Sequence, residues 1–265
     1  MSMSDGGTRP APNPALRIGL PVAVGLVGLG VWQFLVGVVG VSAYLLPSPA
    51  EIAREWSANA GPIAEATWIT GTNAVLGLAV GAVVGVLLAA VASRWQAIDL
   101  MLIPVVAALA VVPIVALAPV LNSMFGADSE IGRRTIAAIA SFVPVFLNSL
   151  RGLRQTTPLH RDLMRAYAAT GGQTFRLLTL PAAAPYVVTG LRVASSLAVI
   201  SALVAEYFGG PRGGLGAFIS TSAATSAYAR AWAYVGASIL LGLALYLVTV
   251  ALERLVNRLL AGGAR

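Results

Sequence analysis

Residues 151–185 read RGLRQTTPLHRDLMRAYAATGGQTFRLLTLPAAAP and separate two long apolar runs of the chain. Five arginines and one acid carry the charge of this segment: Arg151, Arg154, Arg161, Arg165, Arg176 and Asp162. The flanking runs have the composition of membrane-spanning helices, whereas this segment is too polar to cross a bilayer. We therefore expect it to lie in the cytoplasm and to meet a partner there.

The first half of the segment has the sequence pattern of a helix. Thr157 is a suitable N-cap, and Pro158 suits the first helical position, where a missing N–H does no harm. We expect this helix to run to Thr170, with one face formed by Leu159, Leu163, Ala166 and Thr170.

The second half predicts a bend and another short helix. Gly171 and Gly172 are expected to end the first helix, because glycine readily takes the left-handed closing conformation. The second helix is expected over residues 173–180, closed by Pro181. Two short helices across a bend would form a knob suited to a groove on a partner.

Composition places the 265-residue chain among integral membrane proteins. It is 58% hydrophobic and 10% charged, with a mean hydropathy of +0.84, whereas soluble domains carry roughly 25% charged residues. The net charge of +7 comes from arginine, since the chain has no lysine. These arginines flank apolar spans, so membrane orientation explains them better than nucleic-acid binding.

Missing residue types exclude several chemistries. Without lysine the chain has no ordinary Walker A site, so it does not bind ATP in that way. Without cysteine it has no thiol catalysis, disulfide or thiolate metal site. His160 is the single histidine and cannot form a histidine metal cluster.

The N-terminal part is expected to contain a tail, one span and a short helix. Residues 1–16 read as a disordered cytoplasmic tail, and residues 17–66 as the first membrane helix followed by an external amphipathic helix. Ser48 and Glu51 are spaced as a capping box at the start of that second helix, with Pro49 between them.

Five further spans are expected over residues 68–92, 98–121, 135–150, 186–208 and 231–252, with a polar link over 209–230. The first of these contains a GxxxGxxxG ridge that we expect to be a packing seam: Gly77, Gly81 and Gly85. The next contains Pro104, Pro113 and Pro119 and must bend or break. We expect Arg192 and Glu206, near the two ends of the span over 186–208, to reach the membrane interfaces by snorkelling.

The arginines predict the orientation. If the chain crosses the membrane six times, twelve arginines lie on one side: residues 9, 17, 94, 151, 154, 161, 165, 176, 192, 254, 258 and 265. The other side has five: residues 54, 133, 134, 212 and 230. The arginine-rich side is expected to be cytoplasmic, together with both termini.

Residues 151–185 also resemble the cytoplasmic coupling loop of the permease subunits of binding-protein-dependent ABC importers. In that pattern Glu-Ala-Ala is followed by three residues, Gly, nine residues, Ile, one residue and Leu-Pro. In this chain Asp162 stands for the glutamate, Ala168 for the glycine and Leu178 for the isoleucine, whereas Leu180 and Pro181 match outright. The chain departs from the pattern at Leu163 and Met164, which replace both alanines, and at Ala168, with glycines at 171 and 172 instead. The stretch LPSPAE before the capped helix is similar to the nitrate/sulfonate/taurine branch.

The resemblance implies an all-α type I importer permease with six transmembrane helices and a core over residues 67–260. It implies a second permease copy, a cytoplasmic ATPase dimer that binds the ATP, an external substrate-binding protein and a bacterial cytoplasmic (inner) membrane. This chain would then carry no cofactor and no catalytic site. The implied coupling residues are Asp162, Leu163, Arg165, Tyr167, Ala168, Gly171, Gly172, Leu178, Leu180 and Pro181.

Polar residues inside the spans are candidates for a translocation path: Gln33, Asn73, Asn148, Ser195, Ser196 and Ser201. Hydrogen bonding between helices explains them equally well. The solute would be a sulfonate, taurine or nitrate, or else a vitamin precursor such as a pyrimidine or riboflavin.

Two other functions are weighed against the importer permease. An autonomous channel or ion-coupled carrier would transport without an ATPase, but the deep-lying acids are only Asp99 and Glu206 near span ends. An intramembrane enzyme would need a zinc-ligand pair, a Ser-His dyad or paired aspartates within the spans, which the sequence lacks.

Overall fold

The computed structural model describes residues 14–42, 44, 46–126, 129–209 and 213–262. Most of the predicted tail, residues 1–13, lies outside this range, and residues 14–16 already belong to the first helix. The described residues form helices and no strand. Five helices are long and apolar enough to cross a membrane: α1 (Pro14–Gly37), α3 (Ala60–Arg94), α6 (Ile131–Leu153), α9 (Leu180–Phe208) and α11 (Tyr228–Gly262).

A bent pair of helices, counted together as one broken span, makes the sixth. α4 (Gln96–Val111) and α5 (Ile114–Phe125) meet at an angle of 96° across Pro113. Proline has no N–H for the helical ladder and clashes with the preceding turn, so the chain breaks there. The expected break in the third span and the all-α fold with six spans are both confirmed.

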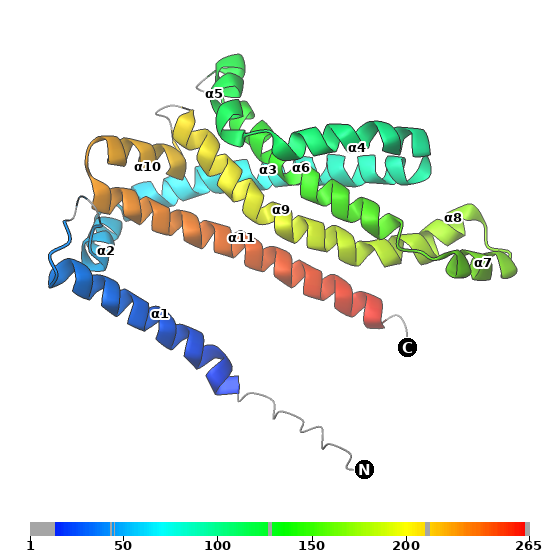
Figure 1. The fold of residues 1–265 in the computed structure, drawn as a ribbon, viewed down its shortest axis with the longest axis horizontal. Helices are drawn as coiled ribbons and strands as arrows, with labels where there is room; N and C mark the ends of the chain where they lie inside the picture. The colour runs from blue at the N-terminus through cyan, green and yellow to red at the C-terminus, as the bar shows by residue number, and fades with distance from the viewer. Residues whose placement is uncertain (1–13, 43, 45, 127–128, 210–212, 263–265) are drawn as a thin grey trace, which may run out of the picture.

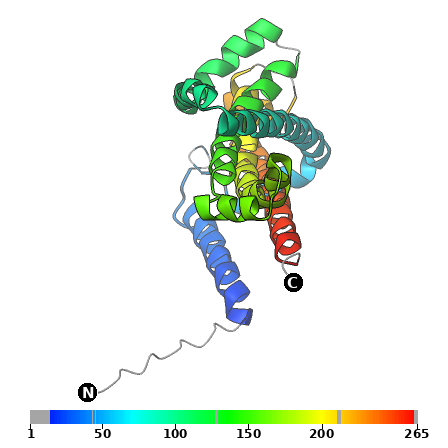
Figure 2. The ribbon, with the colours of Figure 1, turned by 90° about the vertical axis from the view of Figure 1, so that its right-hand side faces the viewer.

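Three long helices form the centre of the bundle. α3 and α9 both pack against α6, and α11 lies along α9. In Figure 1, α2 (Pro49–Ala58) and α10 (Leu215–Ala224) lie at one end of the bundle, and α7 (Pro158–Ala166) and α8 (Gly171–Thr174) lie at the opposite end. Helix α1 leaves the bundle at an angle (Figures 1 and 2). Its contacts gather near its C-terminal end, where Trp32 meets Trp232 of α11 with ring centroids 5.7 Å apart.

The glycine ridge of α3 is the closest helix–helix contact of the centre. Gly77, Gly81 and Gly85 face the backbone of α6, and a Cβ added at Gly81 would run into the carbonyl oxygen of Ala138. A Cβ at Gly77 would likewise collide with Ala137. Small residues let two helices approach this closely in lipid, where apolar burial does not drive them together. The predicted packing seam is confirmed.

The capping box that begins α2 is also confirmed. Glu51 N–H donates to the Ser48 hydroxyl at 3.2 Å, and Ser48 N–H donates to the Glu51 carboxylate at 2.9 Å. The apolar face of α2, with Ile52 and Trp56, packs on α3 and α11 around Tyr234. The short helix α2 is thus fastened to the bundle.

The link over residues 209–230 and the place of Glu206 differ from expectation. The link contains a helix, α10, that packs on α9 and α11. Glu206 is fully buried and accepts hydrogen bonds from the Thr70 hydroxyl at 2.7 Å and from Gly216 N–H at 3.1 Å. The prediction that Glu206 snorkels to the interface is therefore wrong, because α10 supplies internal partners for its carboxyl group.

Candidate functional site

The knob, defined as residues 157–181, begins as the sequence predicts. Thr157 caps α7 by accepting a hydrogen bond from His160 N–H at 3.4 Å, and Pro158 is the first helical residue. The helix ends at Ala166, four residues before the expected end. Ala168 has φ +50°, so this alanine makes the left-handed turn that closes α7. It occupies the position at which the importer pattern has glycine, the residue that takes this conformation without steric cost.

Gly171 and Gly172 have a different role from the one expected. They begin α8, where Thr170 is the N-cap. Gln173 N–H donates to the Thr170 hydroxyl at 3.3 Å, and Thr170 N–H donates to the Gln173 amide oxygen at 2.8 Å. The prediction that the two glycines stop the first helix is wrong, because this reciprocal capping starts a new helix at that point.

The second limb of the knob continues into a spanning helix. A π-helical turn, η1 (Phe175–Thr179), joins α8 directly to α9. Pro181 lies in the first turn of α9 and does not close a separate helix, so that expectation is also wrong. A proline without an N–H is tolerated there. The second limb, from Gly171 onwards, is thus a continuous helical extension of α9, and a displacement of α8 would be transmitted along that helix.

Exposed apolar side chains cover the knob. Leu159 is 76% exposed, Leu163 54%, Tyr167 77% and Leu177 66%. Asp162 and Arg165 form an ion pair of 3.0 Å at the surface beside them. Leu178 and Pro181 are partly buried. An apolar surface on a polar protrusion marks a site for protein contact.

Four of the six candidate path residues have partners or places within the helix packing. Asn73 donates to Glu130 at 2.6 Å, and its oxygen accepts from Arg134 at 3.1 Å. Gln33 is exposed and accepts Ala50 N–H at 3.3 Å. Ser195 is buried against Thr249 at 3.2 Å, and Ser201 is buried with an unbonded hydroxyl.

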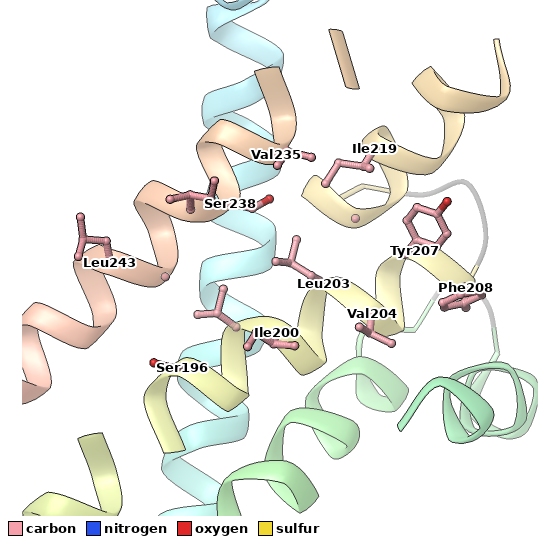
Figure 3. A pocket seen from close by; sticks show the side chains of 14 residues that line it. Ser196, Ile200, Leu203, Val204, Tyr207, Phe208, Ile219, Val235, Ser238 and Leu243 are labelled. Atoms are coloured by element: carbon pink, nitrogen blue, oxygen red, sulfur yellow. The ribbon is translucent and has the colours of Figure 1, made fainter. Parts of the chain in front are cut away.

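Ser196 and Asn148 line two separate cavities. Ser196 lies in a cavity of about 460 Å³ between α9, α10 and α11, whose other lining is almost wholly apolar (Figure 3). Asn148 lies in a cavity of about 350 Å³ beside the α4–α5 break. Arg151, one turn further along α6, lines the same cavity. The sequence analysis counted Arg151 only as a loop charge, although its i, i+3 spacing from Asn148 predicts a shared helix face.

Two ion pairs fasten the helices at the knob end of the bundle. Asp99 of α4 pairs with Arg154 at 2.8 Å. Glu253 of α11 pairs with Arg192 of α9 at 2.8 Å and also accepts the Thr189 hydroxyl at 2.8 Å. Arg192 therefore has an internal partner, which the sequence analysis did not identify.

Residues 61–260 match the family described as the binding-protein-dependent transport system inner membrane component. This range holds α4 to α10, nearly all of α3 and α11, and the whole knob. The chain belongs to this family.

Curated relatives include several transport permeases. The permease is 32% identical over 250 residues to the riboflavin transport system permease protein of Chloroflexus aurantiacus, covering 92% of this chain and 90% of that protein. It is 30% identical to the formylaminopyrimidine transport permease protein of Halalkalibacterium halodurans, covering 73% and 77%. It is 28% identical to the aliphatic sulfonates transport permease protein, a putative one by its name, of Bacillus subtilis, covering 70% and 67%.

These matches settle the class of the protein. The chain is the transmembrane permease subunit of an ATP-driven ABC importer that receives its solute from a binding protein. It works with an ATPase and a substrate-binding protein, and it crosses the inner membrane several times. The expected membership of the type I importer permeases, in the nitrate/sulfonate branch, is confirmed.

Proposed function

We propose that the knob is the part through which this permease receives the movement of the ATPase. Its exposed leucines and Tyr167 would fill a recess of the ATPase, and the ion pair of Asp162 with Arg165 would exchange into contacts with that partner. The observation that carries this proposal is the unbroken helical path from the knob through η1 into α9. The knob also holds positions that align with the importer pattern, namely Ala168, Leu178, Leu180 and Pro181.

Closure of the ATPase pair would then rock the bundle. A push on α8 reaches α9 without an intervening loop, and α9 packs on α6 and α11. The Arg192–Glu253 pair joins α9 and α11 at the knob end of the bundle, so these helices would move together. Inward-open and outward-open states would follow from their different contacts with the nucleotide-loaded and nucleotide-free ATPase.

Two copies of this chain, each with the core proposed over residues 67–260, would form the membrane part of the importer. The end of the bundle that carries α2 and α10 lies opposite the knob (Figure 1), so it would face outward and receive the binding protein. The excess of arginines at the knob end supports a cytoplasmic knob and cytoplasmic termini. The missing lysine supports an ATP site that lies wholly on the partner.

The proposed solute is small and is either an oxyanion, such as a sulfonate or nitrate, or a vitamin precursor. The named relatives carry riboflavin, a formylaminopyrimidine and aliphatic sulfonates. The sequence identities of these three relatives to the chain are nearly equal. The binding protein makes the final selection.

Crosslinking tests the role of the knob, because the chain has no cysteine of its own. A Tyr167→Cys variant is tagged and isolated from native membranes together with its ATPase. We expect this cysteine to crosslink to the ATPase with a short bifunctional reagent. Val248→Cys is the control: Val248 is also exposed but lies on α11, outside the knob, and its cysteine should not crosslink.

Two coupling variants complete the experiment. A Cβ added at Gly171 or Gly172 meets no atom within 4 Å, so these positions are open in the chain itself and a larger side chain there would project towards a partner. We expect the Gly171→Leu, Gly172→Leu double variant and Asp162→Lys to insert normally but to lose solute-stimulated ATP hydrolysis. Normal stimulation in both variants, or transport without any ATPase, would contradict the proposed coupling.

A further inference from the structure

The cavity beside the α4–α5 break is built as a pocket for a small molecule. Its volume is about 350 Å³, and its wall comes from four helices. Val112 lies at the break itself, Leu147 comes from α6 and Leu197 from α9. Broken helices at membrane depth occur where backbone lines a cavity or packs in protein. Most of this wall is apolar.

Two polar side chains occupy one side of the cavity. Asn148 and Arg151 lie one turn apart on α6. One N–H of the Asn148 amide donates to the Pro144 carbonyl at 2.8 Å, which fixes the amide and leaves its second N–H available. Within the described residues, the Arg151 guanidinium makes neither a hydrogen bond nor an ion pair. All its donors are free for a ligand.

The charge of Arg151 has no neighbouring acid to balance it. The described acids at the knob end are Asp99, Asp162 and Glu253, and each is paired with another arginine. Asp99 pairs with Arg154, Asp162 with Arg165, and Glu253 with Arg192. Arg151 is exposed and lines one side of an apolar cavity, so its unpaired guanidinium can attract an anion to that cavity.

We propose that this cavity is a solute subsite of the translocation path and takes a small organic anion. The anionic oxygens bind the guanidinium of Arg151 and the amide N–H of Asn148. The apolar body of the solute lies against Val112, Leu147 and Leu197. Guanidinium and amide groups suit a sulfonate or carboxylate, because both present several acceptor oxygens to a fixed set of donors.

This subsite rests on the proposed importer function and narrows its solute to an anion. The subsite also assigns a function to the α4–α5 break. If the break closes or opens as the bundle rocks, the apolar wall moves relative to Arg151 on α6. The anion is then held in one state and released in the other.

Charged thiol reagents test the subsite in the cysteine-free chain. Leu147→Cys places a thiol in the cavity and leaves Asn148 and Arg151 in place. The probes are sulfonatoethyl methanethiosulfonate, an alkanesulfonate, and its trimethylammonium analogue. For each variant, the rate with the anionic probe is divided by the rate with the cationic probe. We expect this ratio to be about tenfold or more higher for Leu147→Cys than for Leu240→Cys, which lies in the apolar α3–α11 cavity.

Two second-site variants identify the cause. Arg151→Gln should abolish the preference for the anionic probe. Arg94→Gln, which removes the same charge from the same end of the bundle outside the cavity, should keep it. Ethanesulfonate should protect the thiol of the Leu147→Cys variant in a concentration-dependent way, and tetramethylammonium should not.

Three results would overturn the subsite: equal probe preferences in the Leu147→Cys and Leu240→Cys variants, a preference that survives Arg151→Gln, or no protection by ethanesulfonate. The protein is measured in phosphatidylcholine vesicles with and without phosphatidylglycerol. Protection by phosphatidylglycerol alone would make the cavity a lipid site and would also overturn the proposal. The importer function is judged separately by solute-stimulated ATP hydrolysis, so one proposal can fail without the other.

Discussion

The Thr70 hydroxyl of α3 donates to the Glu206 carboxyl of α9 at 2.7 Å, and both side chains bind the first turn of α10. Leu215 N–H donates to Thr70 at 2.8 Å and Gly216 N–H donates to Glu206 at 3.1 Å. The N-cap of α10 is Gly214, which has no side chain to satisfy these donors. The cap of α10 is therefore supplied by two other helices.

Removing this cap should destabilise the end of the bundle that carries α10. Glu206→Ala leaves Gly216 N–H and the Thr70 hydroxyl buried without an acceptor, which should cost about 3 kcal/mol. Glu206→Gln keeps an acceptor and should cost about 1 kcal/mol. Thermal unfolding in nanodiscs measures both. The exposed Glu65→Ala is the matched control, and an equal effect of Glu206→Ala and Glu65→Ala would refute the role of Glu206 as a cap.

The glycine seam should tolerate no added side chain. Gly81→Leu would force its Cβ into the Ala138 carbonyl of α6, so α3 and α6 would have to separate. We expect a loss of about 3 kcal/mol or failure to fold. Gly25→Leu in α1 is the control, because a Cβ there meets nothing within 4 Å. Size-exclusion profiles and thermal unfolding give the comparison; two indistinguishable variants would show that the seam is loose.

Replacing Ala168 with glycine should stabilise the turn at the end of α7. An L-residue at φ +50° costs roughly 1–2 kcal/mol relative to glycine, so Ala168→Gly should stabilise the turn that closes α7. Ala168→Val should weaken it, since a branched side chain is worse in this region. Hydrogen exchange of Ala169 N–H, which donates to the Met164 carbonyl at 2.9 Å, reports the turn locally. Slower exchange in the valine variant would contradict this account.

The sequence predicted those features that depend on neighbours along the chain. Apolar runs of sufficient length identified the spans, the three prolines at 104, 113 and 119 a bend or break without its exact place, and the spacing of Ser48 and Glu51 the capping box. The Thr170–Gln173 capping box was readable in the same way, but the glycines at 171–172 suggested a stop. A glycine pair fits a helix start as well as an end, and only the capping residue distinguishes the two.

Features that depend on distant residues were not predictable. Glu206 is buried because Thr70 and the start of α10 meet it, and the charge pattern of α9 alone contains neither partner. Arg151 was assigned to the loop, since its cavity exists only where the α4–α5 break faces α6. Both sites arise from packing between spans, which periodicity along one helix does not determine.

The capping box of α2 should make that helix sensitive to acid. Bonds from the Ser48 backbone N–H and hydroxyl hold the pKa of Glu51 below its ordinary value of 4.5. Because the folded pKa is the lower one, the stabilisation is complete above about pH 4.5 and is lost as pH falls through the folded pKa. Hydrogen exchange of Ile52 N–H, which donates to the Ser48 carbonyl at 3.0 Å, measures the opening of this turn after correction for the intrinsic rate.

Protection of Ile52 N–H should stay constant in the wild type from about pH 6 to about 4.5 and should fall as the pH drops further, because a glutamate whose pKa is lowered titrates below its ordinary value. Glu51→Gln keeps the capping geometry but cannot titrate, so its protection should stay constant over the same range. Ser48→Ala should lower protection at every pH by about 1 kcal/mol, because it removes the cap itself. If Glu51→Gln showed the same acid dependence as the wild type, the titrating group would have to lie elsewhere on α2, and Glu55, which pairs with Arg230 at 3.0 Å, would be the next residue to replace.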